Sequence, residues 1–575
     1  MRLNFFVSAR WDKRSRLTRL LCRLGPTWSS SPVRRIVQVL ALVGFLILFF
    51  YVCWPYGGRH YSETLAAKEW VDAEVFLAID PLVSVSAALA ARRWVWSLAA
   101  AGAALSVCLV FPRGFCGYVC PIGTFLDIFD WTVARWMPKL HLNRKAWWVN
   151  LRYFILATVL VSAAFGVLLS GFVAAIVVWT RAILLFAGPV QMGLLKGWHL
   201  VPPINTWHWI SLALFGIIVG TGLLERRFWC KYLCPTGALF SLGALLSLTG
   251  RKVTSDCVSC GKCRTVCDFA AIRDDFMTHQ ARCSFCQSCG GICPVGAVQF
   301  AGRWNDEKTG TSSGESTVSC SRRSLLAGFG TAMGAGVGIA AVVGRPVANR
   351  PVIRPPGSVP EEAFLQLCVR CGQCIKACPN NALQPAGLES GFNGLWAPQV
   401  VADWSGCEPS CNNCGQVCPT GAIRALPLVE KRATQLALAV VDKQTCLPYA
   451  GRRKCQYYVD ECRAAGYEAI EFIRVRGQND EQSRPIEGSG FLAPVVLEDK
   501  CVGCGLCQMR CRAMNVKNEH LLDASAIVIH AGPGREDRLF NGSYVDLRKR
   551  RQSPTNNTPG RTDAPVENYL PDFLR

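Results

Sequence analysis

The stretch CVSCGKCRTVCDFAAIRDDFMTHQARCSFCQSCGGICP, residues 257–294, contains two cysteine groups with the same spacing. In each group, three cysteines are separated by two residues, and a fourth follows after three more. Chains that hold two iron–sulfur clusters use this spacing, and there the fourth cysteine of each group binds the other group's cluster. Zinc is the alternative, but zinc sites usually pair two Cys-x2-Cys units across a longer spacer.

The spacing predicts two [4Fe-4S] clusters with crossed ligands, in a bacterial ferredoxin-like α+β domain over residues 251–300. The triad of each group reaches three corners of one cluster, and the fourth cysteine reaches the neighbouring cluster. The first cluster is assigned to Cys257, Cys260, Cys263 and Cys293. The second cluster is assigned to Cys283, Cys286, Cys289 and Cys267.

The pattern returns later in the chain, and together these groups account for most of its 31 cysteines. Two of the later groups have the same spacing and one is stretched by a residue, so each predicts a further cluster. These groups are Cys368, Cys371, Cys374 and Cys378; Cys501, Cys504, Cys507 and Cys511; and the stretched Cys407, Cys411, Cys414 and Cys418.

A degenerate group lies between the stretched group and the last one. It consists of Cys446, Cys455 and Cys462, and Tyr458 stands where the spacing after Cys455 leads to a cysteine. One cluster ligand is therefore missing from this group. Four cysteines lie outside these groups and outside an internal repeat described below, and they are expected to pack as small apolar side chains; they are Cys22, Cys53, Cys108 and Cys320.

The composition predicts a membrane domain, because 51% of the 575 residues are hydrophobic. A span needs about 20 largely apolar residues. Before residue 250 we predict spans at residues 36–54, 94–111, 153–179 and 207–224. Two shorter apolar stretches, residues 76–91 and 183–195, are expected to be re-entrant or interfacial.

The charge distribution predicts the orientation of these spans. The formal net charge is +22, and the excess lies beside the apolar segments, as in membrane anchoring and not as in nucleic-acid binding. Residues 1–35 are rich in Lys and Arg, as is the loop after the second span, and basic loops stay in the cytoplasm. The N-terminus and residues 251–320 are therefore predicted to be cytoplasmic.

An internal repeat occurs in two loops of the predicted membrane domain. RGFCGYVCPIGTFL (residues 113–126) aligns with RFWCKYLCPTGALF (residues 227–240). One interpretation is a single cluster that shares the four thiolates of both copies, because a [4Fe-4S] cluster takes four. The other is a structural turn with packed thiols. The cysteines concerned are Cys116, Cys120, Cys230 and Cys234.

Residues 321–345 have the form of an export signal in the middle of the chain. Arg322 and Arg323 precede an apolar run, residues 324–344, that carries no charge. SRRSLL resembles a twin-arginine signal; the alternative is an ordinary fifth span with basic flanks. Both send the later cysteine groups across the membrane. Twin-arginine export is favoured because thiolates must meet iron before an oxidising compartment pairs them as disulfides.

These motifs together resemble two known groups of proteins. Residues 30–300, with paired Cys-x3-Cys-Pro elements and two ferredoxin motifs, resemble the NapH, MauN and NosR membrane polyferredoxins. Residues 320–530 resemble the NapG and MauM ferredoxin-type proteins. The chain departs from the NapG pattern at Tyr458, and Asp268 and Arg512 replace the proline that usually follows the fourth ligand.

The resemblance implies the pairing of the exported groups. By analogy with related four-group subunits, the first group is expected to pair with the fourth and the second with the third. Cys462 would then complete the cluster of the second group, and the degenerate cluster would keep Cys418, Cys446 and Cys455. A [3Fe-4S] cluster is the hypothesis for that site, and absence of the cluster is the alternative.

The resemblance also implies a function. NapH and NapG form a quinol dehydrogenase, so this chain is expected to pass electrons from the quinol pool to a periplasmic reductase or cytochrome. An accessory factor that matures or reduces a periplasmic metalloenzyme is the alternative, and a redox-sensing scaffold is a third. For His199 and His208, interfacial solvation is the favoured interpretation, and service to a quinone or a b-type haem is the alternative.

The sequence therefore predicts a multi-domain protein of the inner bacterial membrane, with helices in the membrane and ferredoxin-like domains on both sides. Expected cofactors are two cytoplasmic and three or four exported clusters, with quinol as substrate and the twin-arginine machinery as a partner. The predicted organisation is a basic N-terminus (1–35), a membrane domain (36–250), a cytoplasmic ferredoxin domain (251–300), a linker (301–320), a signal or anchor helix (321–345), an exported polyferredoxin domain (346–535) and a disordered tail (536–575).

Overall fold

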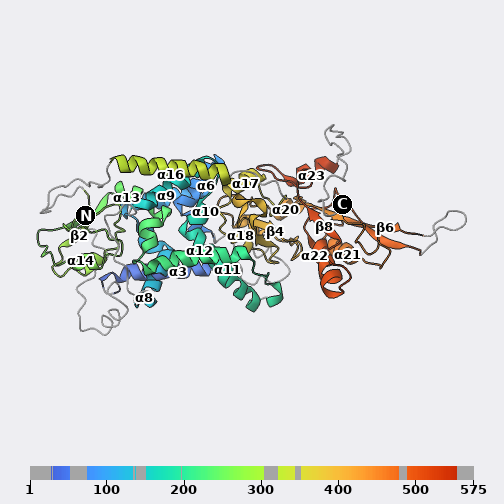
Figure 1. Ribbon diagram of the computed structural model, residues 1–575, viewed down its shortest axis with the longest axis horizontal. Helices are drawn as coiled ribbons and strands as arrows, with labels where there is room; N and C mark the ends of the chain where they lie inside the picture. Colours follow the sequence, from blue (N-terminus) through green and yellow to red (C-terminus); the bar gives the residue numbers. More distant parts are fainter. Residues whose placement is uncertain are drawn as a thin grey trace.

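The computed structural model describes residues 28, 30–51, 74–133, 136, 150–195, 197–303, 322–343, 351–477 and 489–552. The described part of the molecule is elongated, with helices along its long axis and a small strand-containing domain at each end (Figure 1). The domain of residues 249–303 lies at one end, and residues 351–552 form the other (Figure 1). Most of the N-terminal segment, Cys22, Cys53, Cys320, most of the linker and residues 553–575 lie outside the described residues.

Four of the described helices are long and apolar enough to cross a membrane. Three come before the first ferredoxin motif: α3 (Pro32–Tyr51), α11 (Ala175–Leu195) and α12 (Thr206–Gly220). The fourth is α16 (Arg322–Val343), within the export-like segment. Among the described residues, three helices before α16 are long enough for a span, where four spans were predicted.

The predicted span at residues 153–179 is broken in two. α9 (Leu151–Ala164) ends before Gly166, whose φ of 81° takes the chain into the left-handed region. After α10 (Ser170–Val173), the stretch expected to be re-entrant continues as the full-length α11. No charged residue or proline marks this break in the sequence, so hydropathy alone predicted one span where the structure has two helices.

Short apolar helices complete the bundle. The predicted span at residues 94–111 is the 14-residue α7 (Ser97–Val110), which is short for a bilayer. α7 packs with α6 (Pro81–Ala91), and α13 (Pro235–Leu245) contacts α6, α7 and α9. The remaining elements of this region are α5 (Val75–Ala78), α8 (Pro121–Thr132), the π-helices Phe115–Val119 and Trp229–Leu233, and the 3-10 helices Trp198–Leu200 and Thr221–Leu223.

α16 lies along the bundle and packs on α9 through small residues (Figure 1). A Cβ atom at Gly328 would lie 2.3 Å from the Phe154 ring, and one at Gly336 would lie 2.9 Å from Val161. Thr158 and Ser162 of α9 donate hydrogen bonds of 3.2 Å each to backbone carbonyls of α16. Close approach through small residues with hydroxyl bonds across the contact is how helices associate in lipid.

The domain at the end nearest α13 is ferredoxin-like, as predicted. β1 (Thr249–Val253) pairs antiparallel with β2 (Val298–Gly302), so the strands close the two ends of the cysteine-rich segment against each other. The short helices α14 (Lys262–Thr265) and α15 (Ser288–Gly291) lie between the strands in sequence, one within each cysteine group.

The domain at the other end consists of two successive units. In the first, β3 (Leu383–Pro385) pairs with β4 (Pro398–Val400). In the second, β5 (Leu438–Val441) pairs with β8 (Ile527–His530), and the hairpin β6 (Ile470–Val475) and β7 (Phe491–Val496) lies between them in sequence. The helices are α17 (Glu361–Leu367), α18 (Gln373–Lys376), α19 (Asn413–Gln416), α20 (Leu428–Ala433), α21 (Tyr457–Ala464), α22 (Leu506–Cys511) and the π-helix Arg512–Asn518, with 3-10 turns Leu388–Ser390 and Phe392–Gly394.

The predicted disordered tail is wrong over its first part. Residues 536–552 are described and include α23 (Tyr544–Gln552), which packs on α20. Glu430 accepts hydrogen bonds from the Ser543 hydroxyl and the Tyr544 backbone N–H, at 2.6 Å each, and Tyr544 is 1% exposed. One buried aromatic ring and one carboxylate hold this helix in place.

Candidate iron–sulfur centres and the junction with the bundle

The structure places one of the two crossing cysteines of the first ferredoxin domain beside the neighbouring group. A pocket is lined by Cys283, Cys286 and Cys289 together with Cys267, the fourth cysteine of the preceding group. Cys293 packs in an apolar cluster that contains Cys263 and also Cys267 and Cys289, so its assignment to the first cluster stays a prediction.

Burial sets the protonation of these thiols. It raises the pKa of Cys283 to about 12 and raises that of Cys267 and Cys289 above the ordinary value. The thiols are therefore protonated before iron binds, and cluster insertion must release their protons. Within the described residues, no three His, Cys, Asp or Glu side chains converge on a point that one metal ion could occupy.

The cluster-binding loops repeat one backbone feature. The residue before the second cysteine has a positive φ in four groups, at Ser259, Phe285, Arg370 and Gly503. The residue after that cysteine is also left-handed, at 74° in Gly261 and 59° in Gln287. Such turns direct successive backbone N–H groups toward an anion, and the thiolate-bound cluster supplies one. The stretched group departs from this, because Asn412 has a φ of −132°.

The internal repeat forms a pair of matching elements. In each copy a π-helix precedes the second cysteine, and Arg113 and Arg227 take φ values of 50° and 52°. A Cβ at Gly237 would lie 3.4 Å from the Arg113 guanidinium, and one at Gly123 would lie 3.6 Å from Arg227. Each arginine thus reaches the glycine of the other copy.

Because the two copies of the repeat contact each other in this way, their four cysteines lie close together. Cys120 lies close enough to Cys116, Cys230 and Cys234 to interact electrostatically with all of them. Each is buried or partly buried in the core of the bundle. The arrangement favours the shared-cluster interpretation of the repeat, since a mere turn would not require the two copies to meet.

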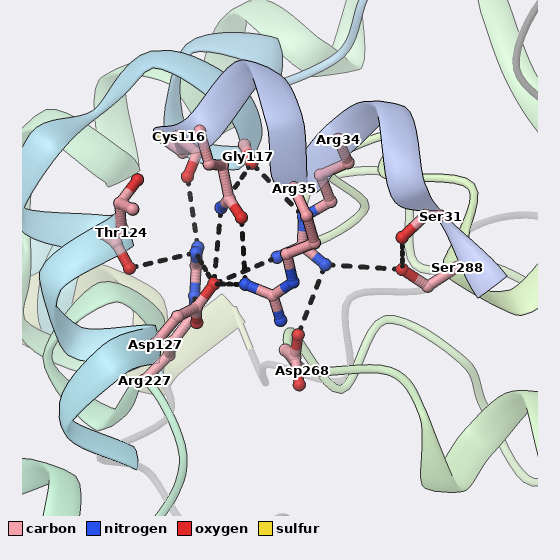
Figure 2. Close-up of polar contacts among 12 residues, drawn as sticks. Ser31, Arg34, Arg35, Cys116, Gly117, Thr124, Asp127, Arg227, Asp268 and Ser288 are labelled. Atoms are coloured by element: carbon pink, nitrogen blue, oxygen red, sulfur yellow. Dashed lines mark hydrogen bonds and ion pairs between the residues drawn. The ribbon is translucent and has the colours of Figure 1, made fainter. Parts of the chain in front are cut away.

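A buried ionic network joins this site to the ferredoxin domain (Figure 2). Asp127 of α8 accepts two hydrogen bonds from Arg227, at 2.6 and 2.7 Å, and one of 2.5 Å from Arg35. Arg34 pairs with Asp127 at 3.6 Å and with Asp268 of the ferredoxin domain at 3.4 Å. Ser31 and Ser288 share a hydrogen bond of 2.7 Å. The start of α3 is therefore fixed to both cysteine sites.

The pairing expected for the exported groups was wrong. Cys418 interacts electrostatically with Cys368, Cys371 and Cys374, so it completes the first group and not the degenerate one. Cys378 in turn lies beside the second group, Cys407, Cys411 and Cys414. The first group thus pairs with the second. The reason is local: each fourth cysteine crosses to the next group along the chain, as in residues 257–293.

The third and fourth groups pair in the same way. Cys462 lies beside Cys501, Cys504 and Cys507, and Cys511 lies beside Cys446 and Cys455. The second and fourth groups are adjacent, because the Cys407 N–H donates to the Cys504 carbonyl at 2.7 Å. The four sites of residues 368–511 therefore form a row from the first group, through the second and fourth, to the degenerate third.

The degenerate site contains three thiols and a tyrosine. The Tyr458 hydroxyl is 3.5 Å from the Cys446 sulfur, and Tyr458 is 2% exposed. Asn515 donates from its amide to the sulfurs of Cys455 and Cys511, at 3.7 and 3.5 Å. Burial, followed by the hydrogen bond with Cys446, raises the pKa of Tyr458, so its phenol is neutral. The three thiols are Cys446, Cys455 and Cys511, where the sequence had suggested Cys418.

The first exported group rests directly on the helix bundle. A Cβ at Gly372 would lie 2.5 Å from the Leu184 side chain of α11, and one at Gly171 would lie 2.6 Å from the Val369 carbonyl. Arg370, between Cys368 and Cys371, donates to the Leu168 carbonyl at 2.6 Å. The loop that carries this group is thus in van der Waals and hydrogen-bond contact with the membrane domain.

An arginine of α11 completes this junction from the membrane side. Arg181 is 2% exposed and donates to the carbonyls of Gly171 and Arg370, at 2.9 and 3.2 Å. Its guanidinium lies 4.0 Å from the Trp396 ring centroid, and Trp396 donates to the Trp207 carbonyl at 2.9 Å. These contacts are numerous and buried, so the junction is a packed interface.

Sequence comparisons agree with this division of the chain. A family model described as a 4Fe-4S dicluster domain matches residues 367–422, which are the first two exported groups. MauM, a methylamine utilization ferredoxin-type protein of Methylorubrum extorquens, is 36% identical over 200 residues, which cover 33% of this chain and 84% of MauM. The chain belongs to the MauM and NapG family of ferredoxin-type proteins. The dicluster match also agrees with the pairing of the first group with the second.

The other relatives define the extent of the MauM-like part. NapG of Escherichia coli is 38% identical over 162 residues, covering 28% of this chain and 65% of NapG, so the chain spans less than two thirds of that relative. MauN of Methylobacillus flagellatus is 29% identical over 245 residues, covering 41% of this chain and 74% of MauN. A 4Fe-4S binding domain model matches residues 93–140 and 207–253. No solved structure matches the chain.

These findings establish a fusion of a MauN-like part with a MauM/NapG-like part. The second family model covers both copies of the internal repeat, one in each matched segment. The matches to the two 4Fe-4S family models and the cysteine groups together show that the protein holds multiple [4Fe-4S] clusters and transfers electrons through them.

Sequence reasoning missed the charged groups that connect the sites. Asp127 lies in the loop predicted to follow the second span, Arg181 lies between two predicted apolar stretches, and Arg370 lies between two cysteines in a loop, so none of them belonged to a recognised motif. Asp268 was noticed solely as a replacement for proline. Only Arg113 and Arg227 carried a signal, because both copies of the repeat begin with arginine.

The crossed ligation makes a testable prediction. Because Cys267 lines the pocket of the second triad, Cys267→Ala should release that cluster and leave the first triad loaded. In the full-length protein under anaerobic conditions, alkylation should then reach Cys283, Cys286 and Cys289, while Cys257, Cys260 and Cys263 stay protected. Cys108→Ala, which removes a buried thiol outside every group, is the matched control. Alkylation confined to the first triad would contradict the assignment.

Proposed function

We propose that the protein carries electrons from membrane quinol to a periplasmic redox partner such as a reductase or cytochrome. The observation that carries the proposal is the contact of the first exported group with α11. A Cβ at Gly372, next to Cys371, would meet Leu184 of that helix. A reductant dissolved in the membrane can therefore reach a cluster ligand loop without leaving the bundle. Quinol is the abundant lipid-soluble two-electron carrier of bacterial membranes.

The row of exported sites supports an outward path for the electrons. The first group contacts the bundle, and the second group adjoins the first. The fourth group lies against the second through Cys407 and Cys504. The degenerate site follows through Cys511 on α22. The row thus leads away from the membrane domain, and its far end is where we place the docking of the periplasmic partner.

The proposal assigns the two ends of the molecule to opposite sides of the inner membrane. Residues 249–303 and 351–552 lie at opposite ends of the bundle (Figure 1). The basic residues 1–35 place the first of these in the cytoplasm. The twin-arginine pair at Arg322 and Arg323, at the start of α16, sends the second into the periplasm.

The proposed cofactors follow from the geometry of the described cysteines. Two clusters belong to residues 257–293, one to the four membrane-domain cysteines, and three complete ones to the exported groups. The degenerate site holds a [3Fe-4S] cluster. This arrangement fits the donors present, since each complete site offers four thiols and the degenerate site offers three.

Reduction of the clusters by quinol tests the proposal. In anaerobic membranes that contain the protein, duroquinol should bleach the cluster absorption that dithionite also bleaches. Cys371→Ser, which removes a ligand of the group on α11, should slow bleaching by duroquinol at least tenfold. Cys108→Ser is the matched control and should behave as the native chain. Clusters that dithionite reduces and duroquinol never does would contradict the proposal.

A second candidate is an accessory factor that reduces or matures a periplasmic metalloenzyme. The chain covers 84% of MauM but 65% of NapG, which favours a role like that of the methylamine utilization proteins. Deleting the gene separates the two functions. A periplasmic enzyme that is made complete but receives no electrons indicates the conduit, and one that lacks its mature cofactor indicates the accessory factor.

A further inference from the structure

A partly open cavity of about 70 Å³ lies at the junction of the bundle with the exported domain. Its walls come from separate parts of the chain and are mainly apolar. α11 contributes Leu184 and Met192, the segment before α12 contributes Ile204, and the exported domain contributes Ile375 and Leu383. Ile375 directly follows Cys374, so the cavity adjoins a ligand of the first exported group.

The cavity lies next to a lipid-facing surface. α11 is long and apolar enough to cross the membrane, and its side chains Phe186 and Leu194 are 75% and 73% exposed. Leu195, at the end of this helix, lines the cavity and is 45% exposed. An apolar chain can therefore run from the bilayer into the cavity without crossing polar surface. This apolar path fits a ligand with a polyisoprenoid or acyl tail.

The polar groups of the cavity select the head group of that ligand. The Gln384 side-chain nitrogen is buried and has no hydrogen-bond partner within the described structure. His208 is 9% exposed, and its Nδ1 accepts a hydrogen bond of 3.2 Å from the Asn205 backbone N–H, so the neutral ring carries its hydrogen on Nε2 and can donate it. Buried donors are normally satisfied, so the Gln384 amide indicates an acceptor on a bound molecule.

Other polar side chains of the cavity are already engaged. Lys376 donates to the Gln191 amide oxygen, and its ammonium lies 5.0 Å from the Phe49 ring centroid. Asn381 donates to the Leu200 carbonyl at 2.8 Å. None of the described residues that line the cavity is a carboxylate. A cationic ligand is thus disfavoured, and a neutral head group with oxygen atoms matches the free donor and the free imidazole nitrogen.

We propose that this cavity binds membrane quinol, with Gln384 donating to one quinol oxygen and His208 Nε2–H donating to the other. The inference rests on the proposed function and locates its substrate site. Oxidation breaks both quinol O–H bonds and yields quinone, two electrons and two protons. The cluster that Cys368, Cys371 and Cys374 would hold would take the electrons one at a time and supply them to the periplasmic partner. The two protons would leave to water.

The test uses the full-length protein in lipid nanodiscs and has two readouts. One is the dissociation constant of heptylhydroxyquinoline N-oxide, a fluorescent quinol analogue. The other is the rate at which duroquinol bleaches the clusters, with dithionite as a check that all variants carry them. The variants are His208→Gln and Gln384→Ala. Matched controls are His199→Gln, outside the cavity, and Gln399→Ala, the partner of Gln384 across the β3–β4 pair.

We expect both cavity variants to bind the analogue at least tenfold more weakly and to be bleached by duroquinol at least tenfold more slowly. Both controls should match the native chain. Native-like binding and bleaching in the cavity variants would overturn this site and leave the proposed function standing. Failure of duroquinol to bleach the native chain would instead overturn the proposed function. Co-purifying phospholipid that is lost in Gln384→Ala, with quinol oxidation unchanged, would identify the cavity as a lipid site and overturn the inference.

Discussion

Replacing both Arg322 and Arg323 by lysine should abolish the appearance of residues 351–552 outside the cytoplasm. The substitution keeps both positive charges, so an ordinary span oriented by the positive-inside rule would be unaffected. A twin-arginine signal is read by a receptor that recognises the guanidinium pair and not the charge alone. We therefore expect a near-complete loss of export, with the membrane helices before residue 250 still inserted.

Protease accessibility measures this directly. Protease added to cells permeabilised only at the outer membrane should digest residues 351–552 of the native chain and spare those of the double variant. Arg303→Lys is the matched control, because Arg303 precedes the signal and donates to the Leu245 carbonyl. Digestion of the double variant at the native rate would show that α16 is an ordinary span. Protection of the native domain would overturn the proposed sidedness.

The second large effect is expected at the degenerate site. Three thiols, Cys446, Cys455 and Cys511, surround it, and the neutral Tyr458 phenol occupies the fourth corner. A phenol with an ordinary pKa of about 10 is a poor substitute for a thiolate. A three-iron cluster should therefore form, lacking the iron nearest Tyr458. Ligand and cluster type set the reduction potential, so this site should differ from its three all-cysteine neighbours.

Electron paramagnetic resonance of the mildly oxidised, anaerobically purified chain tests this assignment. The native protein should show a three-iron signal, and Tyr458→Cys should abolish it while gaining about one iron atom per chain as a four-iron cluster forms. Tyr457→Cys is the matched control, because the Tyr457 hydroxyl bonds Glu519 instead of a ligand. Four ordinary four-iron clusters in the native exported domain would refute the hypothesis. Iron for only three would indicate that this cluster is absent.

The spacing of cysteines predicted the triads well, and it could not predict every fourth ligand. A triad is held by one short loop, so its members follow from local sequence. The fourth thiol depends on which group lies beside it in space. Cys267 was assigned to the cluster of the next group along the chain, and this assignment was correct. Cys418 was instead assigned by analogy with other four-group proteins, and that assignment was wrong. The structure applies one rule throughout, in which adjacent groups exchange their fourth cysteine.

The membrane domain shows the limit of hydropathy in the same way. An apolar run predicts burial in lipid or protein, but it does not distinguish one long helix from two short ones. Residues 153–179 contain the turn at Gly166, and only the positive φ reveals it. The Asp127 network was equally hidden, because its partners Arg34, Arg227 and Arg35 are distant in sequence. Ion pairs between residues that are distant in sequence produce no periodic pattern in the sequence.

The seam between α9 and α16 changes the thermodynamics of the contact between the bundle and the exported domain. α16 is bound to α9 through Gly328 and Gly336 and precedes the exported domain along the chain. A tether of this kind holds two binding surfaces at an effective concentration of about millimolar. The contact around Arg370 and Arg181 therefore stays closed even if its intrinsic affinity is weak, because the bundle and the exported domain belong to one chain. Dilution of the protein does not separate these two domains.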